Sequence, residues 1–228
     1  RIVAVERSGY GWSEPSRSPR DIATILEETR TALELSGEKG PYVLFAHSMA
    51  GLEALYWAQQ YPHEIEAIIG LDPCTPDAVA LLPEPSMATL YAMALVSRTG
   101  LARYMPDADI EMNLPLMASD DLTEEEQRDY LAVFYKSAYS RDMIREAARL
   151  RDNAQTVAEG TAPEAIPMYF FASDGQEAVV TGWQDALAEY LAPLASAEYM
   201  QLNTGHYVHY EKADMIAQEA RLFLEDVR

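Results

Sequence analysis

Two short apolar runs joined by a helical segment constrain the fold of this chain more than any other feature. Residues 42–45 and 67–71 are continuous apolar runs, as expected for strands that are covered on both faces. Between them, residues 49–61 have a helical pattern that ends at Pro62. Because strand, helix and strand follow in this order, we predict a parallel sheet with crossover helices.

Apolar runs elsewhere in the chain extend this pattern. Residues 2–5 form a β-branched run before a glycine-rich turn, which predicts a strand and its following loop. A helix is expected next, with Ser18 as its cap, Pro19 in its first turn and Gly37 at its end. Further strands are expected at residues 167–172 and 198–202, and further helices at 182–194 and 214–227.

The middle of the chain has a different character, because strand-like runs are absent from residues 73–165. Helical patterns occur there near residues 86–97, 124–137 and 141–159, and Thr123 with Glu126 forms a capping-box pattern. We therefore predict an α/β core formed by residues 1–72 and 166–228, with residues 73–165 inserted as a helical cap.

The charge and the cysteine content exclude several classes of partner. The formal net charge is -20, which repels phosphate backbones, so we expect no nucleic-acid partner. No apolar stretch approaches the length that spans a bilayer, so we expect no stable membrane insertion. Cys74 is the single cysteine, which excludes an intramolecular disulfide and argues against a cysteine metal site. We expect no metal, no cofactor and a cytoplasmic location, while the oligomeric state is left open.

A serine lies between the predicted strand at residues 42–45 and the helix that follows it. Residues 46–51 read Ala-His-Ser-Met-Ala-Gly, with Ser48 flanked by small residues two positions away on each side. This is the context of a nucleophile elbow, a tight strand-to-helix turn that exposes a serine hydroxyl. Ser48 is therefore the candidate nucleophile, and capping of the helix is the alternative role for it.

A serine hydroxyl needs a base to take its proton, and the chain has four histidines. His47 is adjacent to Ser48, so its side chain is expected to point away, and His63 is expected in a surface loop. His206 follows the last predicted strand and can swing over the carboxyl edge of the sheet towards Ser48. We therefore assign His206 as the candidate base. His206 and His209 together do not indicate a metal site, because no acidic ligand accompanies them in the sequence.

The base needs an acid that fixes its tautomer, and two aspartates come directly after predicted strands. Asp72 ends the run 68–72, and Asp174 ends the run 170–174. Both keep the chain order serine, aspartate, histidine, so the pattern alone leaves both open.

Taken together, these motifs resemble the α/β-hydrolase superfamily over essentially the whole chain. Residues 7–14 are similar to the loop after the family's fourth strand, and residues 46–51 match its nucleophile elbow. Gly205 with His206 matches the family's histidine loop, and the middle segment matches its cap. The family has three further strands before these and a His-Gly loop, so we interpret the chain as lacking N-terminal strands.

The resemblance also implies roles for particular residues. The backbone N–H of Met49 is implied as one oxyanion-hole donor, and the other donor belongs to the missing loop. One branch, which includes many haloalkane dehalogenases, places the acid where Asp72 lies, so we prefer Asp72 to Asp174. Those dehalogenases use an aspartate nucleophile where this chain has Ser48.

The expected activity is that of a serine hydrolase. A small-molecule substrate, a small to medium carboxylic ester, would be cleaved through an acyl-enzyme. Three alternatives use the same fold. They are an amidase or aminopeptidase, an acyltransferase, and a non-catalytic binding module.

Overall fold

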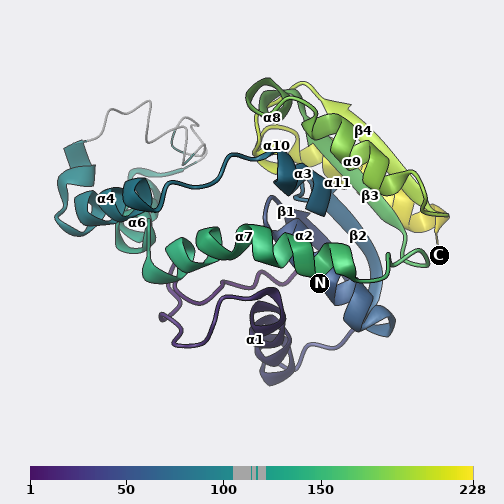
Figure 1. Ribbon diagram of the computed structural model, residues 1–228, viewed down its shortest axis with the longest axis horizontal. Helices are drawn as coiled ribbons and strands as arrows, with labels where there is room; N and C mark the ends of the chain where they lie inside the picture. The colour runs from purple at the N-terminus through teal and green to yellow at the C-terminus, as the bar shows by residue number, and fades with distance from the viewer. Residues whose placement is uncertain (105–113, 115–116, 118–121, 228) are drawn as a thin grey trace. The chain divides into compact units, whose positions relative to one another are not determined.

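The computed structural model describes residues 1–104, 114, 117 and 122–227 (Figure 1). Within these residues the chain forms two compact units, one of Arg1–Thr24 with Glu84–Arg149 and one of Ile25–Pro83 with Leu150–Arg228. The expected cap comprises residues 73–165, whereas the middle part of the chain that belongs to the first unit is Glu84–Arg149. The assignment of a cap stays a prediction.

The second unit is built on four parallel strands that follow one another in sequence order across the sheet (Figure 1). They are β1 (Tyr42–His47), β2 (Ile65–Leu71), β3 (Met168–Ser173) and β4 (Ala197–Leu202). The prediction of a parallel sheet is confirmed, and four of the five predicted strands are present. All four strands end at the same edge, so residues that follow them are brought together.

Helices cover both faces of this sheet. Helix α2 (Ala50–Gln60) contacts β1 and β2, and α9 (Trp183–Leu191) contacts β3 and β4 on one face. On the other face, α10 (Val208–Glu211) and α11 (Ala213–Asp226) close a core with the strands. Its buried members are Ala67, Ile69, Leu71, Tyr169, Phe171, Leu202, Val208, Ile216, Ala220 and Phe223. The central strands β2 and β3 are buried on both sides and are apolar with little alternation, as predicted for residues 67–71. The expectation that residues 42–45 are covered on both faces is wrong, because β1 is an outer strand of the described sheet and Phe45 is 54% exposed.

The remaining helices of the second unit are short connections or flanks. They are α3 (Pro76–Leu81), α8 (Asp174–Val179) and the 3₁₀ turn at Pro62–Glu64. Two longer helices, α1 (Ile22–Leu35) and α7 (Arg141–Glu159), contain the boundary between the two units. Helix α1 starts later than expected, because the Asp21 carboxylate rather than Ser18 accepts the Thr24 N–H at 3.0 Å.

The prediction of a strand at residues 2–5 is wrong. Within the described residues this segment pairs with no strand, and Ile2, Val3 and Val5 are 97%, 45% and 39% exposed. Strand propensity reflects the packing of side chains on a pleated surface, so a β-branched run without a neighbouring strand does not form one.

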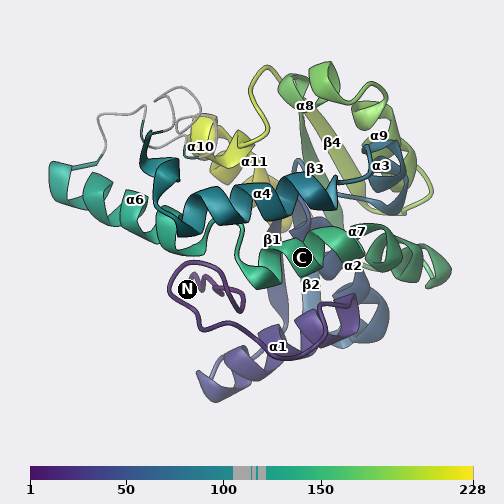
Figure 2. The same cartoon turned by 60° about the vertical axis from the view of Figure 1, so that its left-hand side comes forward.

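In the first unit, α4 (Met87–Arg98) and α6 (Glu124–Ser137) lie side by side, as both views show (Figures 1 and 2). A 3₁₀ turn, Leu101–Tyr104, follows α4. The predicted capping box is confirmed, since the Thr123 hydroxyl accepts the Glu126 N–H and the Glu126 carboxylate accepts the Thr123 N–H.

A buried carboxylate fixes the N-terminal segment of the first unit on α7. Glu146, 3% exposed, accepts hydrogen bonds from Nε and Nη2 of Arg20 at 3.0 and 2.7 Å. Its other oxygen accepts the Tyr10 hydroxyl at 2.8 Å and Arg7 Nη1 at 3.2 Å. Burial, and the Glu146 charge next, raise the pKa of Tyr10 well above its usual value, so its hydroxyl keeps the proton that it donates. Arg7, Tyr10 and Arg20 all belong to residues 1–24, a segment that contains no strand. Their bonds to Glu146 therefore attach this segment to α7.

Within the described residues, none of the helices combines the length and the apolar composition that crossing a bilayer requires.

Candidate active site

Ser48 lies in a tight turn between β1 and α2. Its φ of 54° is in the left-handed region, which is strained for a residue with a Cβ. Two hydrogen bonds hold this turn, because the Ser48 carbonyl accepts the N–H of Gly51 at 2.9 Å and of Cys74 at 2.8 Å. The strained turn places the Ser48 hydroxyl at the carboxyl edge of the sheet.

The turn depends on a close approach between two loops. A Cβ on Gly51 would lie 2.6 Å from the carbonyl oxygen of Cys74, so glycine is required there. Cys74 itself is 2% exposed, and burial raises the pKa of its thiol to about 12. Since the thiolate is the nucleophilic form of cysteine, Cys74 does not compete with Ser48 as a nucleophile.

Asp72 follows β2, also with a left-handed backbone, at φ 52°, and its side chain is completely buried. Its Oδ1 accepts the Ser173 N–H at 3.0 Å and the Trp183 Nε1–H at 2.9 Å. Its Oδ2 accepts the Ser173 hydroxyl and His206 Nδ1, each at 2.7 Å. Four hydrogen bonds therefore satisfy a buried carboxylate and fix its orientation.

His206, in the loop after β4, joins Asp72 to Ser48. Its Nδ1 lies 2.7 Å from Asp72 Oδ2, and its Nε2 lies 3.0 Å from Ser48 Oγ. A carboxylate only accepts, so in the neutral ring the proton is on Nδ1 and Nε2 is left to accept the serine hydroxyl. The arrangement can take a proton from Ser48 and stabilise the imidazolium that results.

The structure separates the two candidate acids. Asp174 is exposed at the start of α8, where its Oδ1 accepts a hydrogen bond from Gln184 Nε2 at 3.0 Å. Its neighbour Ser173 is the residue that contacts Asp72. Of the two aspartates, Asp72 alone has a hydrogen bond to His206 among the described contacts.

Met49 lies between Ser48 and the first residue of α2. Its N–H is among those at the beginning of a helix that have no intrahelical acceptor, and it follows the serine directly in the chain. The resemblance to the family implies this N–H as one oxyanion donor, and that role stays a prediction.

His47 contacts the site, contrary to the expectation that its side chain points away. Its Nε2 lies 3.0 Å from the backbone oxygen of His206, and its ring centroid lies 4.7 Å from that of His206. The rings of Tyr207 and His209 lie 5.2 and 4.6 Å from it. Burial lowers the pKa of His47 to about 4, with smaller contributions from His206 and His209. No feature of the sequence reveals this contact, because it depends on the path of the histidine loop.

Ser173 and Trp183 are also missed by the sequence analysis. Both hold Asp72 from elements that begin about 100 residues later in the chain. Among the described residues, no group of three histidine, cysteine, aspartate or glutamate side chains is placed to bind a metal ion.

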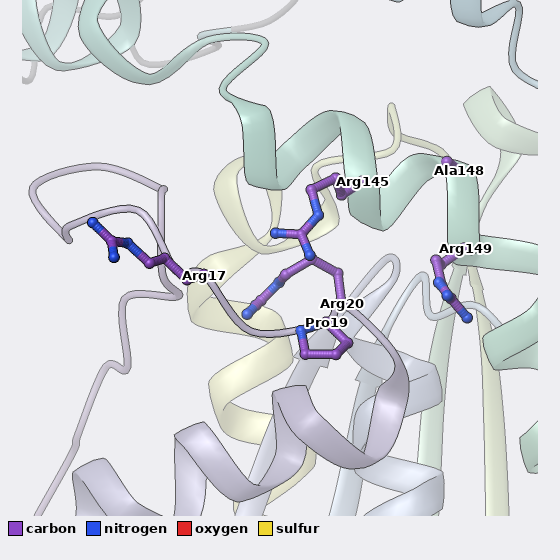
Figure 3. Close-up of a pocket in the computed structure, with 6 residues that line it drawn as sticks. All are labelled: Arg17, Pro19, Arg20, Arg145, Ala148 and Arg149. Atoms are coloured by element: carbon purple, nitrogen blue, oxygen red, sulfur yellow. The ribbon is translucent and has the colours of Figure 1, made fainter.

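The first unit contains a hollow of about 340 Å³ that offers different chemistry (Figure 3). Its lining consists of Arg17, Pro19, Arg20, Arg145, Ala148 and Arg149. Arginine keeps its proton, so these side chains supply neither a nucleophile nor a base. Arg20 and Arg145 are also ion-paired, with Glu146 at 2.7 Å and with Asp142 at 3.3 Å. The candidate active site is therefore the cluster at the sheet edge rather than this hollow.

Comparison with known proteins places this geometry in a family. A model of the alpha/beta hydrolase fold matches residues 1–162. The uncharacterized protein YbdG of Bacillus subtilis is 32% identical over 235 residues, which cover 100% of this chain and 71% of that protein.

Two solved structures illustrate the likeness in fold. A haloalkane dehalogenase from Bradyrhizobium elkani has a TM-score of 0.66 at 17% identity, covering 97% of this chain and 79% of its own. A thermophilic esterase from Thermogutta terrifontis has a TM-score of 0.58 at 17% identity, covering 97% and 78%. At such identities the likeness establishes the fold, and the chemistry must be argued from the site.

Proposed function

We propose that this chain, which belongs to the α/β-hydrolase fold family, is a serine hydrolase acting on carboxylic esters. Ser48 is the nucleophile, His206 the general base and Asp72 the acid that orients it. The substrate is a small to medium ester that is cleaved through an acyl-enzyme.

One observation supports this proposal above the others. The Ser48 hydroxyl, the His206 imidazole and the Asp72 carboxylate form a continuous chain of hydrogen bonds of 3.0 and 2.7 Å. These three residues come from loops after three different strands, and a hydroxyl with such partners can be deprotonated as it attacks.

In the acylation half, Ser48 Oγ attacks the ester carbonyl carbon while its proton moves to His206 Nε2. The carbonyl π electrons move to the oxygen, and the Met49 N–H donates to the oxyanion that forms. When the carbonyl re-forms, the carbon–oxygen bond to the alcohol breaks. The leaving oxygen takes the proton from His206 Nε2, which leaves an ester on Ser48.

In the deacylation half, water replaces the alcohol. The water oxygen attacks the acyl carbon while His206 Nε2 takes a proton from the water, and a second oxyanion forms. Collapse releases the carboxylic acid and returns the proton to Ser48 Oγ. Asp72 stays ionised throughout and stabilises the imidazolium twice in each cycle.

The identity of the nucleophile favours acyl substrates over alkyl halides. A serine oxygen that displaced a halide from carbon would form an ether, which has no carbonyl for water to attack. A serine oxygen that attacks a carbonyl forms an ester, which water can cleave. Ser48 is therefore suited to esters, although a dehalogenase is among the proteins with a similar fold.

The direct test is hydrolysis of p-nitrophenyl butyrate by the wild-type chain, by Ser48→Ala and by Ser36→Ala. Ser36 is an exposed serine whose hydroxyl donates to the Ala32 carbonyl on α1. We expect turnover that Ser48→Ala lowers at least 10³-fold and Ser36→Ala leaves unchanged. Equal activity of Ser48→Ala and wild type would refute the assignment of the nucleophile, and folded wild-type protein without turnover would refute the proposed activity.

A further inference from the structure

We propose that His47 is a positioning residue, which holds the His206 backbone, and with it the imidazole, in register with Ser48. This inference rests on the proposed function and deepens it, because it assigns a role to the residue that precedes the nucleophile.

The strands that precede the nucleophile and the base are not neighbours in the described sheet. Ser48 follows β1 and His206 follows β4, and these are the two outer strands of the described sheet. Neighbouring strands are about 4.8 Å apart, so the histidine loop has to reach back across three spacings, about 14 Å, to meet the serine. No backbone ladder couples β1 directly to β4, so contacts of the loop must fix its position.

Two of these contacts fix the beginning of the loop. The Thr204 carbonyl accepts the Gly175 N–H at 3.0 Å, and the Glu211 carboxylate accepts the Gly205 N–H at 2.8 Å. A Cβ on Gly175 would lie 2.8 Å from the Gly205 Cα, so the loop packs closely there. Both contacts precede residue 206, and neither involves β1.

His47 supplies the contact at the other end. Its Nε2 lies 3.0 Å from the His206 carbonyl oxygen, which is an acceptor, so the bond requires a proton on Nε2. His47 is the last residue of β1 and is bonded to Ser48. One side chain thus connects the turn that carries the nucleophile to the backbone of the base.

The charge state of His47 suits this role. Burial lowers its pKa to about 4, so at neutral pH it is an uncharged donor. The groups that face it are His206, His209, Tyr207 and, more remotely, the Asp72 carboxylate. A charged His47 would repel the imidazolium that His206 becomes during the reaction, whereas the neutral ring donates its hydrogen bond without that repulsion.

Loss of the contact should therefore affect the reaction more than substrate binding. Misplacement of a catalytic group by about 1 Å can lower a rate by about 10²-fold. Because other contacts retain the start of the loop, we expect about a tenfold decrease in kcat and a KM within twofold.

The kinetic test compares His47→Leu, which removes the donor, with His47→Gln, whose amide nitrogen can occupy the place of Nε2. The fraction of active protein is measured as the fraction whose Ser48 is labelled by a fluorophosphonate at completion. We expect kcat per labelled site to fall about tenfold in His47→Leu and to recover to within threefold of wild type in His47→Gln. A merely structural role would lower the melting temperature and the fraction of labelled protein in both variants, with kcat per labelled site unchanged. That result would overturn the proposal.

A second readout does not depend on activity. Long-range ¹H–¹⁵N spectra of the histidine rings in the wild-type chain at pH 7 report which nitrogen of His47 carries the proton. We expect protonated Nε2 and unprotonated Nδ1. A His47 ring protonated on Nδ1 alone could not donate to His206, and it would overturn the proposal even in a chain without turnover. Conversely, the expected tautomer in an inactive chain would support the contact while the proposed function failed.

Discussion

Replacement of Asp72 by asparagine should lower kcat/KM for p-nitrophenyl butyrate by about 10⁴-fold, equivalent to about 5 kcal/mol of transition-state stabilisation. The reason lies in the hydrogen bonds at this position. Two backbone or indole N–H groups, from Ser173 and Trp183, point at Oδ1 and can only donate. The asparagine oxygen must therefore face them, and its NH₂ group must face the side of Oδ2.

On that side the NH₂ group meets the Ser173 hydroxyl and His206 Nδ1, which lie 2.7 Å from Oδ2 in the wild-type chain. The hydroxyl can rotate to accept. The imidazole can accept at Nδ1 only if its proton moves to Nε2, the nitrogen that must take the proton of Ser48. The substitution thus selects the wrong tautomer with little change in shape, and a decrease of this size is known for such a change in a serine protease triad.

The matched control is Asp174→Asn, because Asp174 is exposed and contacts Gln184. Both variants are assayed with the same ester, after denaturant titration has shown that each is folded. We expect Asp174→Asn to remain within about twofold of wild type. A loss of less than tenfold in Asp72→Asn, or an equal loss in Asp174→Asn, would refute the assignment of the acid.

Three further predictions concern stability. His47 binds a proton with a pKa near 6.5 when unfolded and about 4 when folded, so the unfolded state binds more protons between these values. The contribution of His47 to the free energy of unfolding should therefore fall by about 2–3 kcal/mol as the pH falls from 7 to 4.5. Urea unfolding of His47→Gln should lack that part of the decrease, and an identical pH dependence in both chains would contradict this. Glu146→Ala should destabilise the fold by about 3–5 kcal/mol, because it removes the carboxylate that is ion-paired with buried Arg20. As a control, exposed Glu125→Gln should change the free energy of unfolding by less than about 0.5 kcal/mol. Similar unfolding midpoints for the two variants would contradict the importance of the buried ion pair. Gly51→Ala should lower the free energy of unfolding by more than about 2 kcal/mol, because its Cβ would lie 2.6 Å from a carbonyl oxygen. Gly37→Ala, where φ is 77° but no atom lies within 4 Å, should lower it by only about 1 kcal/mol. Equal losses in the two variants would show that the clash is relieved.

The parts of the fold that the sequence predicts are those that local patterns determine. The apolar runs that became β2 and β3 are buried on both faces, and their hydrophobicity reports that environment. The runs that became β1 and β4 are only partly buried, so for them the local pattern predicts a strand without predicting its burial. Residues 2–5 have the same local pattern but no neighbouring strand, and pairing is a property of the tertiary structure that composition does not contain.

The candidate site divides in the same way. Ser48, Asp72 and His206 are recognisable as candidates because each follows a strand, and parallel strands end at the same edge of a sheet. Asp174 also follows a strand at this edge, so topology alone does not select Asp72. Ser173, Trp183 and His47 act through contacts whose existence depends on side-chain directions and on a loop path. Patterns of hydrophobicity do not encode these directions, so the groups that orient the site emerge only from the structure.

The central claim is that Ser48 is an activated nucleophile, and covalent labelling by a fluorophosphonate tests it most directly. Top-down mass spectrometry of the wild-type chain should show one phosphonyl group, located at Ser48, with loss of labelling in Ser48→Ala and strongly slowed labelling in His206→Ala. Folded wild-type protein that stays unlabelled, or that carries the group at another residue, would contradict the account.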